Sequence, residues 1–258
     1  MTNTLQLATE GKLATLTLTR AEKRNAICHA LIDEFLAALQ EVEHSQAQVL
    51  IVRAEGKAFS AGMDLEDLEA LAAHTAAENH AHSERIAELF RSLYEFPKTT
   101  IAAVQGAAIA GGAALATLCD FTVASTAASF GYTEVRIGFV PAIVSAFLIR
   151  QVGEKHVRDL LLTGRILSAE EAYRMGLVNR LVAPEKLADE VQALAAQLLE
   201  NSPASLRATK ALLRLYTGEA LQRDIRIGME ANAGMRKTAD FAEGVRSFLE
   251  RRKPQWSK

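Results

Sequence analysis

Alternating apolar and polar positions open the chain and predict a β-hairpin. Apolar and polar residues alternate at 5–7, a Glu-Gly-Lys turn follows at 10–12, and a β-rich run occupies 13–18. A period of two gives a strand one apolar face. The period then changes, because apolar side chains at 29–42 fall at helical spacing, and 49–52 is a short apolar run typical of a buried strand. The order strand, helix, strand predicts a crossover unit.

A second unit of this kind follows, and its longer helix carries a local start signal. Thr75 with Glu78 three residues later is a capping box, which satisfies free backbone N–H groups at a helix start, and Pro97 ends the segment. In chain order we expect a short helix, a longer helix, a strand, a Gly-rich loop, a small-residue helix and a strand, at residues 65–71, 75–94, 100–104, 106–112, 113–118 and 121–124.

Beyond Pro141 the pattern is almost wholly helical. Helices are predicted at 142–152, 154–162 and 168–175 and over three longer segments that follow, with a single short apolar strand at 177–182. No low-complexity linker divides the chain. The sequence therefore predicts an α/β protein with a core at residues 1–200 and a C-terminal helical region at 201–258 that belongs to the same structural unit.

Composition and charge narrow the function classes. Hydrophobic residues make up 49% of the 258 residues and charged residues 23%, and the formal net charge is -2. This balance excludes disorder for the bulk of the chain and gives no general attraction to nucleic acid or to an anionic membrane. The two cysteines, Cys28 and Cys119, form no disulfide framework. Because no leader-like or bilayer-spanning segment is visible either, we expect a soluble, cytoplasmic protein.

Two turns rich in small residues are the first candidates for chemistry. Residues 59–64 and 108–112 each join a buried strand to a helix start. Glycine lets a ligand approach the backbone, and free N–H groups at a helix start bind developing negative charge. Two such turns facing each other would form an oxyanion hole, whereas the alternative is a pair of ordinary tight connections.

Other familiar sites find little support in the sequence. His74, His80 and His82 cluster without cysteine at a spacing that does not suit a metal site, although one of them could face a pocket as a polar contact. The chain has neither a nucleophile elbow nor a phosphate-binding loop, and residues 106–112 lack the dinucleotide-binding spacing. We therefore expect no metal, no NAD and no ATP.

An ordered series of motifs, including GKAFSAGMDL at 56–65 and FGYTE at 130–134, covers nearly the whole chain. With these motifs the sequence resembles the enoyl-CoA hydratase/isomerase family, the crotonase superfamily. The resemblance implies a crotonase-like β-β-α spiral core whose C-terminal helices build a homotrimer or a dimer of trimers. The matching segments are residues 23–27, 56–65, 97–112, 119–120, 130–134, 162–164, 169–178 and 243–253.

The resemblance also implies an acyl-CoA substrate and places its contacts. The backbone N–H groups of Met63 and Gly111 carry over as donors to the thioester carbonyl, where a preorganised donor is worth roughly 3 to 4 kcal/mol. Family positions that line the CoA path or meet CoA, in part from a neighbouring subunit, match Ala61, Asp64, Leu65, Lys23, Arg24, Phe248 and Arg251. The alternative role for Asp64 is a structural one in the first turn of a helix, and the alternative for each of the three cations is a solvated basic position.

Glu134 matches the glutamate that moves a proton at carbon in this family, and an isolated carboxylate in an apolar pocket should have a raised pKa. The family's other glutamate position is occupied by Ala114, which cannot activate water. We therefore expect an enzyme of fatty acid metabolism, an enoyl-CoA hydratase working with a single glutamate. The alternatives are a Δ3,Δ2-enoyl-CoA isomerase and a non-catalytic acyl-CoA-binding protein. Coenzyme A enters only as part of the substrate.

Overall fold

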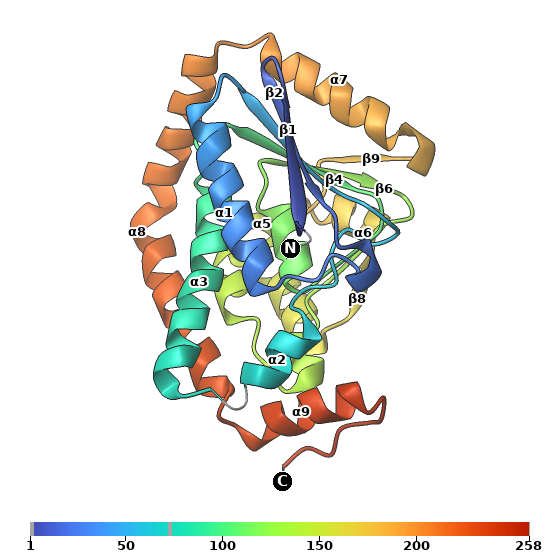
Figure 1. The fold of residues 1–258 in the computed structure, drawn as a ribbon, viewed down its shortest axis with the longest axis vertical. Coiled ribbons are helices and arrows are strands. Elements are labelled where there is room, and N and C mark those ends of the chain that lie inside the picture. The colour runs from blue at the N-terminus through green and yellow to red at the C-terminus, as the bar shows by residue number, and fades with distance from the viewer. Residues whose placement is uncertain (1–2, 72–73, 258) are drawn as a thin grey trace.

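The structure, a computed structural model, describes residues 3–71 and 74–257 and is built on a six-stranded sheet (Figure 1). The strands lie in the order β1-β2-β3-β4-β6-β9. β1 and β2 form the predicted antiparallel hairpin, and all other neighbours in this sheet are parallel. The parallel β2–β3 pair confirms the predicted crossover. The bounds are β1 Leu5–Glu10, β2 Leu13–Leu18, β3 Val49–Ala54, β4 Thr99–Val104, β6 Phe121–Ser125 and β9 Arg180–Val182.

A second sheet corrects the sequence-based picture. It consists of β5 (Ala107–Ile109), β7 (Ser129–Gly131) and β8 (Ile166–Ser168) in that order. The segment 106–112 is therefore not all loop, and the strand at 177–182, now only residues 180–182, is not the single one beyond Pro141. A strand of three residues is too short to show a period. Its pairing also depends on partners far away in the chain, which the local sequence does not reveal.

The helices cover both faces of the larger sheet. Along β3, Val49 and Ile51 pack with α7, whereas Leu50 and Val52 enter the main core together with α1 and α3, as side chains alternate across a strand. The helices are α1 His29–His44, α2 Leu65–Leu71, α3 Ala76–Tyr94, α4 Gly111–Thr117, α5 Ala142–Thr163, α6 Ala169–Arg174, α7 Leu187–Leu199, α8 Pro203–Met235 and α9 Ala239–Leu249, and the 3-10 turns are η1 Ala21–Lys23, η2 Glu134–Ile137 and η3 Pro184–Lys186.

Local signals explain where several helices start and break. The Thr75–Glu78 capping box starts α3 as predicted. A second capping box, between Ser168 and Glu171, starts α6. The two helices predicted on either side of Gly153 form one element, α5, which is kinked where Gly153 takes a φ of 76°. A positive φ is easily adopted by glycine, so the kink follows from the residue itself.

The long helix α8 runs along one side of the molecule, and α9 lies at the end opposite α7 (Figure 1). Leu221 and Ile225 of α8 belong to the main core, so the 201–258 region packs directly on the rest of the chain. α9 rests against η2, where a Cβ on Gly244 would lie 2.2 Å from the carbonyl oxygen of Ile137. Among the described helices, none has the length and apolar character that crossing a bilayer requires.

Candidate active site

The two glycine-containing turns follow neighbouring parallel strands and pack against each other. β3 leads into residues 59–64 and β4 leads into 108–112, and carboxyl ends of parallel strands meet at one edge of a sheet. Gly62 has a φ of +86°, and a Cβ there would lie 2.9 Å from the carbonyl oxygen of Ile109 and 3.5 Å from the nitrogen of Gly111. Only glycine allows this approach.

The backbone N–H groups of Met63 and Gly111 have no protein acceptor among the described residues. On either side of Met63, the carbonyl of Gly62 accepts from Ile27 N at 2.7 Å, and Asp64 N donates to Ile27 O at 2.8 Å. This parallel bridge turns the N–H of Met63 away from Ile27. Gly111 is the first residue of α4, where an N–H has no partner within the helix. Two adjacent free donors can stabilise an oxyanion.

A cavity of about 590 Å³ lies beside these two groups. Met63, Gly111 and Glu134 all line it, so the structure brings together the three residues that the resemblance assigns to catalysis. The further walls come from α2, α3, α5, α8 and α9, from η2 and from the segment between η2 and α5. Their apolar lining residues include Leu68, Leu71, Ile86, Phe90, Ile137, Phe139, Val140, Ile143, Val144 and Val245.

Glu134 begins η2, just beyond the short strand β7. Its Oε2 atom is buried and has no hydrogen-bond partner, although the residue as a whole is only half-buried. Burial raises the pKa of Glu134 from 4.5 to about 7, because the carboxylate is separated from water without a compensating cation. A carboxyl group with this pKa can both accept and return a proton near neutral pH.

The raised pKa of Glu134 predicts a pH-dependent stability. The folded state holds the proton up to about pH 7, whereas the unfolded chain releases it near 4.5. The contribution of protonated Glu134 to the stability of the folded state is therefore complete below pH 4.5 and is lost as the pH rises through 7. Relative to Glu134→Gln, we expect the wild-type free energy of unfolding to fall by about 3 kcal/mol over this interval. Urea denaturation at pH 4.5 and pH 8 measures it, and a pH-independent difference between the two proteins would contradict it.

No second carboxylate among the described lining residues resembles Glu134. Asp64 forms an ion pair with Arg20 at 2.9 Å, and Glu66 forms one with Lys23 at 2.6 Å, while Glu22 and Glu69 are exposed. Ala114 is fully buried in the main core and does not line the cavity. Among the described lining residues, Glu134 is therefore the one carboxylate with a buried, unpaired oxygen.

The residues expected to contact CoA lie mostly at this cavity. Ala61, Asp64, Lys23 and Arg24 line it, while the side chain of Leu65 lies outside the described part of the structure. Asp64 also has the structural role that its position suggests, because its Oδ1 accepts the backbone N–H of Glu66 at 3.2 Å at the start of α2. Their contacts with CoA stay predictions.

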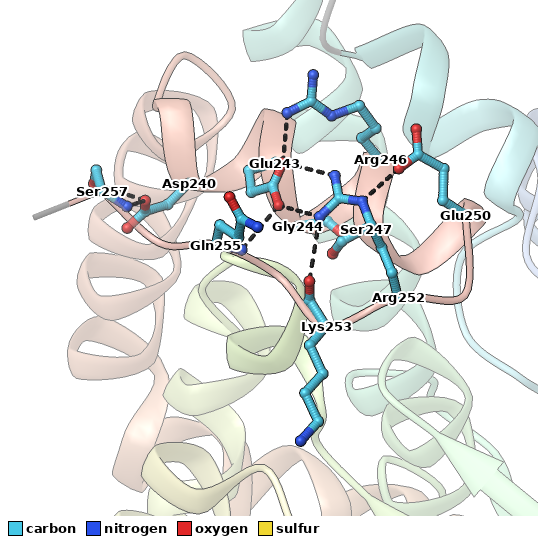
Figure 2. Close-up of polar contacts among 10 residues, drawn as sticks. All are labelled: Asp240, Glu243, Gly244, Arg246, Ser247, Glu250, Arg252, Lys253, Gln255 and Ser257. Atoms are coloured by element: carbon cyan, nitrogen blue, oxygen red, sulfur yellow. Dashed lines mark hydrogen bonds and ion pairs between the residues drawn. The ribbon is translucent and has the colours of Figure 1, made fainter.

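Two C-terminal residues are expected to contact CoA, and the structure places one of them at the cavity. Phe248 lines the cavity and is 53% exposed, whereas Arg251 does not line it in the single chain. Figure 2 shows Arg252 bound to Glu243 and Glu250. The N–H of Gln255 also donates to Glu243 at 2.9 Å, and these bonds hold the pKa of Glu243 well below its usual range. This network fixes the end of α9 beside the cavity.

Breaking the network should release the C-terminal tail. We expect Glu243→Gln to make tryptic cleavage after Arg251 and Arg252 severalfold faster. Residue 243 accepts bonds from Arg252, from Arg246 and from the backbone N–H of Gln255, and the substitution removes its charge. Limited proteolysis followed by mass spectrometry measures the rate. Glu250→Gln is the matched control, since Glu250 accepts only from Arg252 among the described residues. Equal rates in the two variants would contradict the assignment.

One wall of the cavity contains polar residues that the sequence did not single out as a site. His82, Asn232 and Arg236 line it, and His82 is the histidine of the 74–82 group that faces the pocket. His80 instead contacts Glu84 on the surface. Arg236 and Asn232 gave no signal in the sequence, because a cation near a helix end is ordinary. Within the described residues, no group of three His, Cys, Asp or Glu side chains could hold a metal.

Comparison with known proteins identifies the family. The family model for enoyl-CoA hydratase/isomerase matches residues 8–258. The chain is 45% identical over 248 residues to a Thermus thermophilus protein named "Putative enoyl-CoA hydratase", which covers 96% of this chain and 98% of that protein. It is 37% identical over 254 residues to the crotonyl-CoA hydratase of Syntrophomonas wolfei, with 96% and 95% covered.

A solved structure agrees with the expected fold. An enoyl-CoA hydratase/isomerase from Xanthobacter autotrophicus superposes with a TM-score of 0.89 at 27% identity, over 96% of this chain and 93% of that one. The resemblance inferred from the motifs and the expected crotonase-like fold are both confirmed. The chain therefore belongs to the enoyl-CoA hydratase/isomerase family and has the fold of the crotonase superfamily.

Proposed function

We propose that the protein is an enoyl-CoA hydratase that adds water to a 2-trans-enoyl-CoA with Glu134 as its only acid–base group. The observation that carries this proposal is one buried carboxylate, with an unpaired oxygen and a raised pKa, in the same cavity as two free backbone donors. The names of two relatives, the Thermus thermophilus and Syntrophomonas wolfei proteins, agree with it.

In the proposed reaction the thioester oxygen accepts hydrogen bonds from the N–H groups of Met63 and Gly111, which draws electrons toward the carbonyl. Glu134 takes a proton from water as the water oxygen bonds to C3 of the acyl group. Negative charge then resides on the thioester oxygen as an enolate. The carboxyl group of Glu134 then returns the proton to C2. Glu134 is again a carboxylate, and the thioester carbonyl is restored. No step requires a metal or a redox cofactor.

A Δ3,Δ2-enoyl-CoA isomerase is the second candidate, and the position of Ala114 favours it. That residue has no carboxylate and lies in the apolar core, so this position cannot hold or activate water. An isomerase needs one base, because Glu134 would remove a proton from C2 of a 3-enoyl-CoA and return it to C4 of the same substrate. The oxyanion site would act in the same way in both reactions.

For CoA itself we propose contacts from Ala61, Asp64, Leu65, Lys23, Arg24 and Phe248 at the cavity. Arg251 would reach CoA bound to a neighbouring subunit of a homotrimer or a dimer of trimers. Its position outside the cavity of its own chain is consistent with this arrangement.

Absorbance of the conjugated thioester separates these functions. Loss of absorbance from a 2-trans-enoyl-CoA supports the hydratase, and a gain of absorbance from a 3-enoyl-CoA, without loss from the first substrate, supports the isomerase. If neither substrate changes while calorimetry shows binding of an acyl-CoA, the protein is a binding protein and the proposal is wrong. Activity that survives unchanged in Glu134→Gln would also contradict the assignment of Glu134.

A further inference from the structure

A buried arginine forms part of the cavity wall between α3 and α8. Arg236 is only 5% exposed and lines the cavity. Its Nη1 donates to the carbonyl oxygen of Asn79 at 3.0 Å and to Asn79 Oδ1 at 3.2 Å. Its Nη2 donates to Asn232 Oδ1 at 2.8 Å and to His82 Nδ1 at 3.0 Å. All these acceptors are neutral.

The charge of Arg236 thus has no counterion within the described part of the chain, since none of its contacts is a carboxylate. Burial lowers the pKa of Arg236 to about 10, so the guanidinium remains charged at neutral pH. A buried arginine is normally paired with a carboxylate, because an isolated buried charge is costly. A neutral donor would be enough to hydrogen-bond these neutral acceptors. The positive charge of Arg236 therefore points to an anion that binds in the cavity.

Two hydrogen-bond donors in this wall are also unpaired. Arg236 Nε is buried and has no partner. Burial and the neighbouring guanidinium lower the pKa of His82 to about 3, so its ring is neutral. Because His82 Nδ1 accepts a bond from Arg236, the single ring proton resides on Nε2, which is likewise buried without a partner. An unpaired buried donor is as costly as a lost hydrogen bond, and both could be satisfied by one acceptor group.

This polar wall is close to the proposed reaction site. Phe139 donates its backbone N–H to the carbonyl oxygen of Glu134 at 3.0 Å, and its ring lies 5.8 Å from the guanidinium carbon of Arg236. A single residue therefore lies beside both Glu134 and Arg236, and all three line one cavity. The two groups are therefore joined by one continuous cavity, which an acyl group could occupy.

We propose that the acyl group of the substrate ends in a carboxylate, which Arg236 and His82 bind. The substrate class is then the CoA monothioester of a short unsaturated dicarboxylic acid. This inference rests on the proposed function for the reaction at the other end of the acyl group. It adds a specificity determinant, because the two unpaired donors would reject a methyl-terminated chain of equal length.

The test compares five- and six-carbon 2-enoyl-CoA substrates that end in a carboxylate, a primary amide or a methyl group. We expect kcat/KM for the carboxylate to exceed that for the methyl terminus by about 10²-fold, and the amide to lie between them. In Arg236→Met the ratio of carboxylate to methyl should fall to near one. Arg150→Met is the matched control: Arg150 pairs with Asp224 at 2.8 Å away from the cavity, so its loss should keep the ratio.

A binding measurement separates this inference from the proposed function. The saturated thioesters cannot react, so calorimetry with the wild type measures recognition alone. Tighter binding of the carboxylate-terminated thioester, by tenfold or more, supports the inference even if no enoyl-CoA is turned over. This measurement uses the wild type alone, so it tests the inference even if Arg236→Met does not fold. Equal binding of the carboxylate and methyl forms, equal use of the carboxylate and amide, or an unchanged ratio in folded Arg236→Met would each overturn it.

Discussion

Glu134→Gln is expected to lower kcat for the preferred enoyl-CoA substrate by about 10³-fold, because general acid–base catalysis contributes roughly 10² to 10⁴. Glutamine keeps the size of the side chain and its polar end but cannot exchange a proton at neutral pH. The affinity for a saturated acyl-CoA should change little, since the buried Oε2 has no protein partner whose bond would be lost. Steady-state kinetics and calorimetry on the same preparations measure the two quantities.

Glu69→Gln is the matched control for this experiment. Glu69 lines the same cavity but is exposed, so its substitution removes a carboxylate without removing the buried acid–base group. We expect its kcat to stay within about threefold of the wild-type value. In the wild type, kcat/KM should also fall as the pH drops below about 7, because Glu134 must be ionised to take the first proton. Comparable losses in both variants would show that general cavity charge, and not Glu134, governs the rate.

Gly62→Ala is expected to lower kcat/KM by about 10²-fold or more by separating the two backbone donors. The added methyl group would lie 2.9 Å from Ile109 O, 3.0 Å from Ala110 Cβ and 3.5 Å from Gly111 N. These atoms belong to the turn that carries the second N–H, so relief of the contact must shift that turn. A positive φ adds about 1 to 2 kcal/mol of strain for alanine. Kinetics together with urea denaturation measures both effects.

The two effects can be distinguished with Gly176→Ala. Gly176 has the same φ of +86°, and a Cβ there would meet nothing within 4 Å. This variant therefore carries the backbone strain alone, and we expect it to lose stability but to keep its kcat/KM. If Gly62→Ala behaves like Gly176→Ala in both measurements, the contact between the two turns does not position the donors.

Backbone strain supports the same interpretation of this turn. Ala110, which directly precedes Gly111, has a φ of 51° and a ψ of -122°, a conformation that side-chain-bearing residues rarely adopt. Its N–H donates to the carbonyl oxygen of Gly131 at 2.7 Å, so the turn is anchored to β7, the strand just before Glu134. The strained residue thus links the free N–H of Gly111 to the strand that ends three residues before Glu134.

The sequence by itself determined the features that depend on neighbours in the chain. The opening hairpin, the amphipathic helix α1 and both capping boxes follow from periodicity and from contacts over three or four residues. The two small-residue turns were also visible, since a glycine where the chain must bend closely is a local requirement. The motifs around them were specific enough to indicate the family, and Glu134 with them.

Only the tertiary structure decided the features that depend on distant partners. The three-residue strands β5, β7 and β8 pair across the chain and have no period of their own. The contact of Gly62 with Ile109 and Gly111 brings two separate turns together, and the guanidinium of Arg236 meets His82 from a residue 154 positions away. The pKa of Glu134 likewise depends on burial by the surrounding chain. Such burial and pairing arise from packing between segments, which local sequence patterns do not encode.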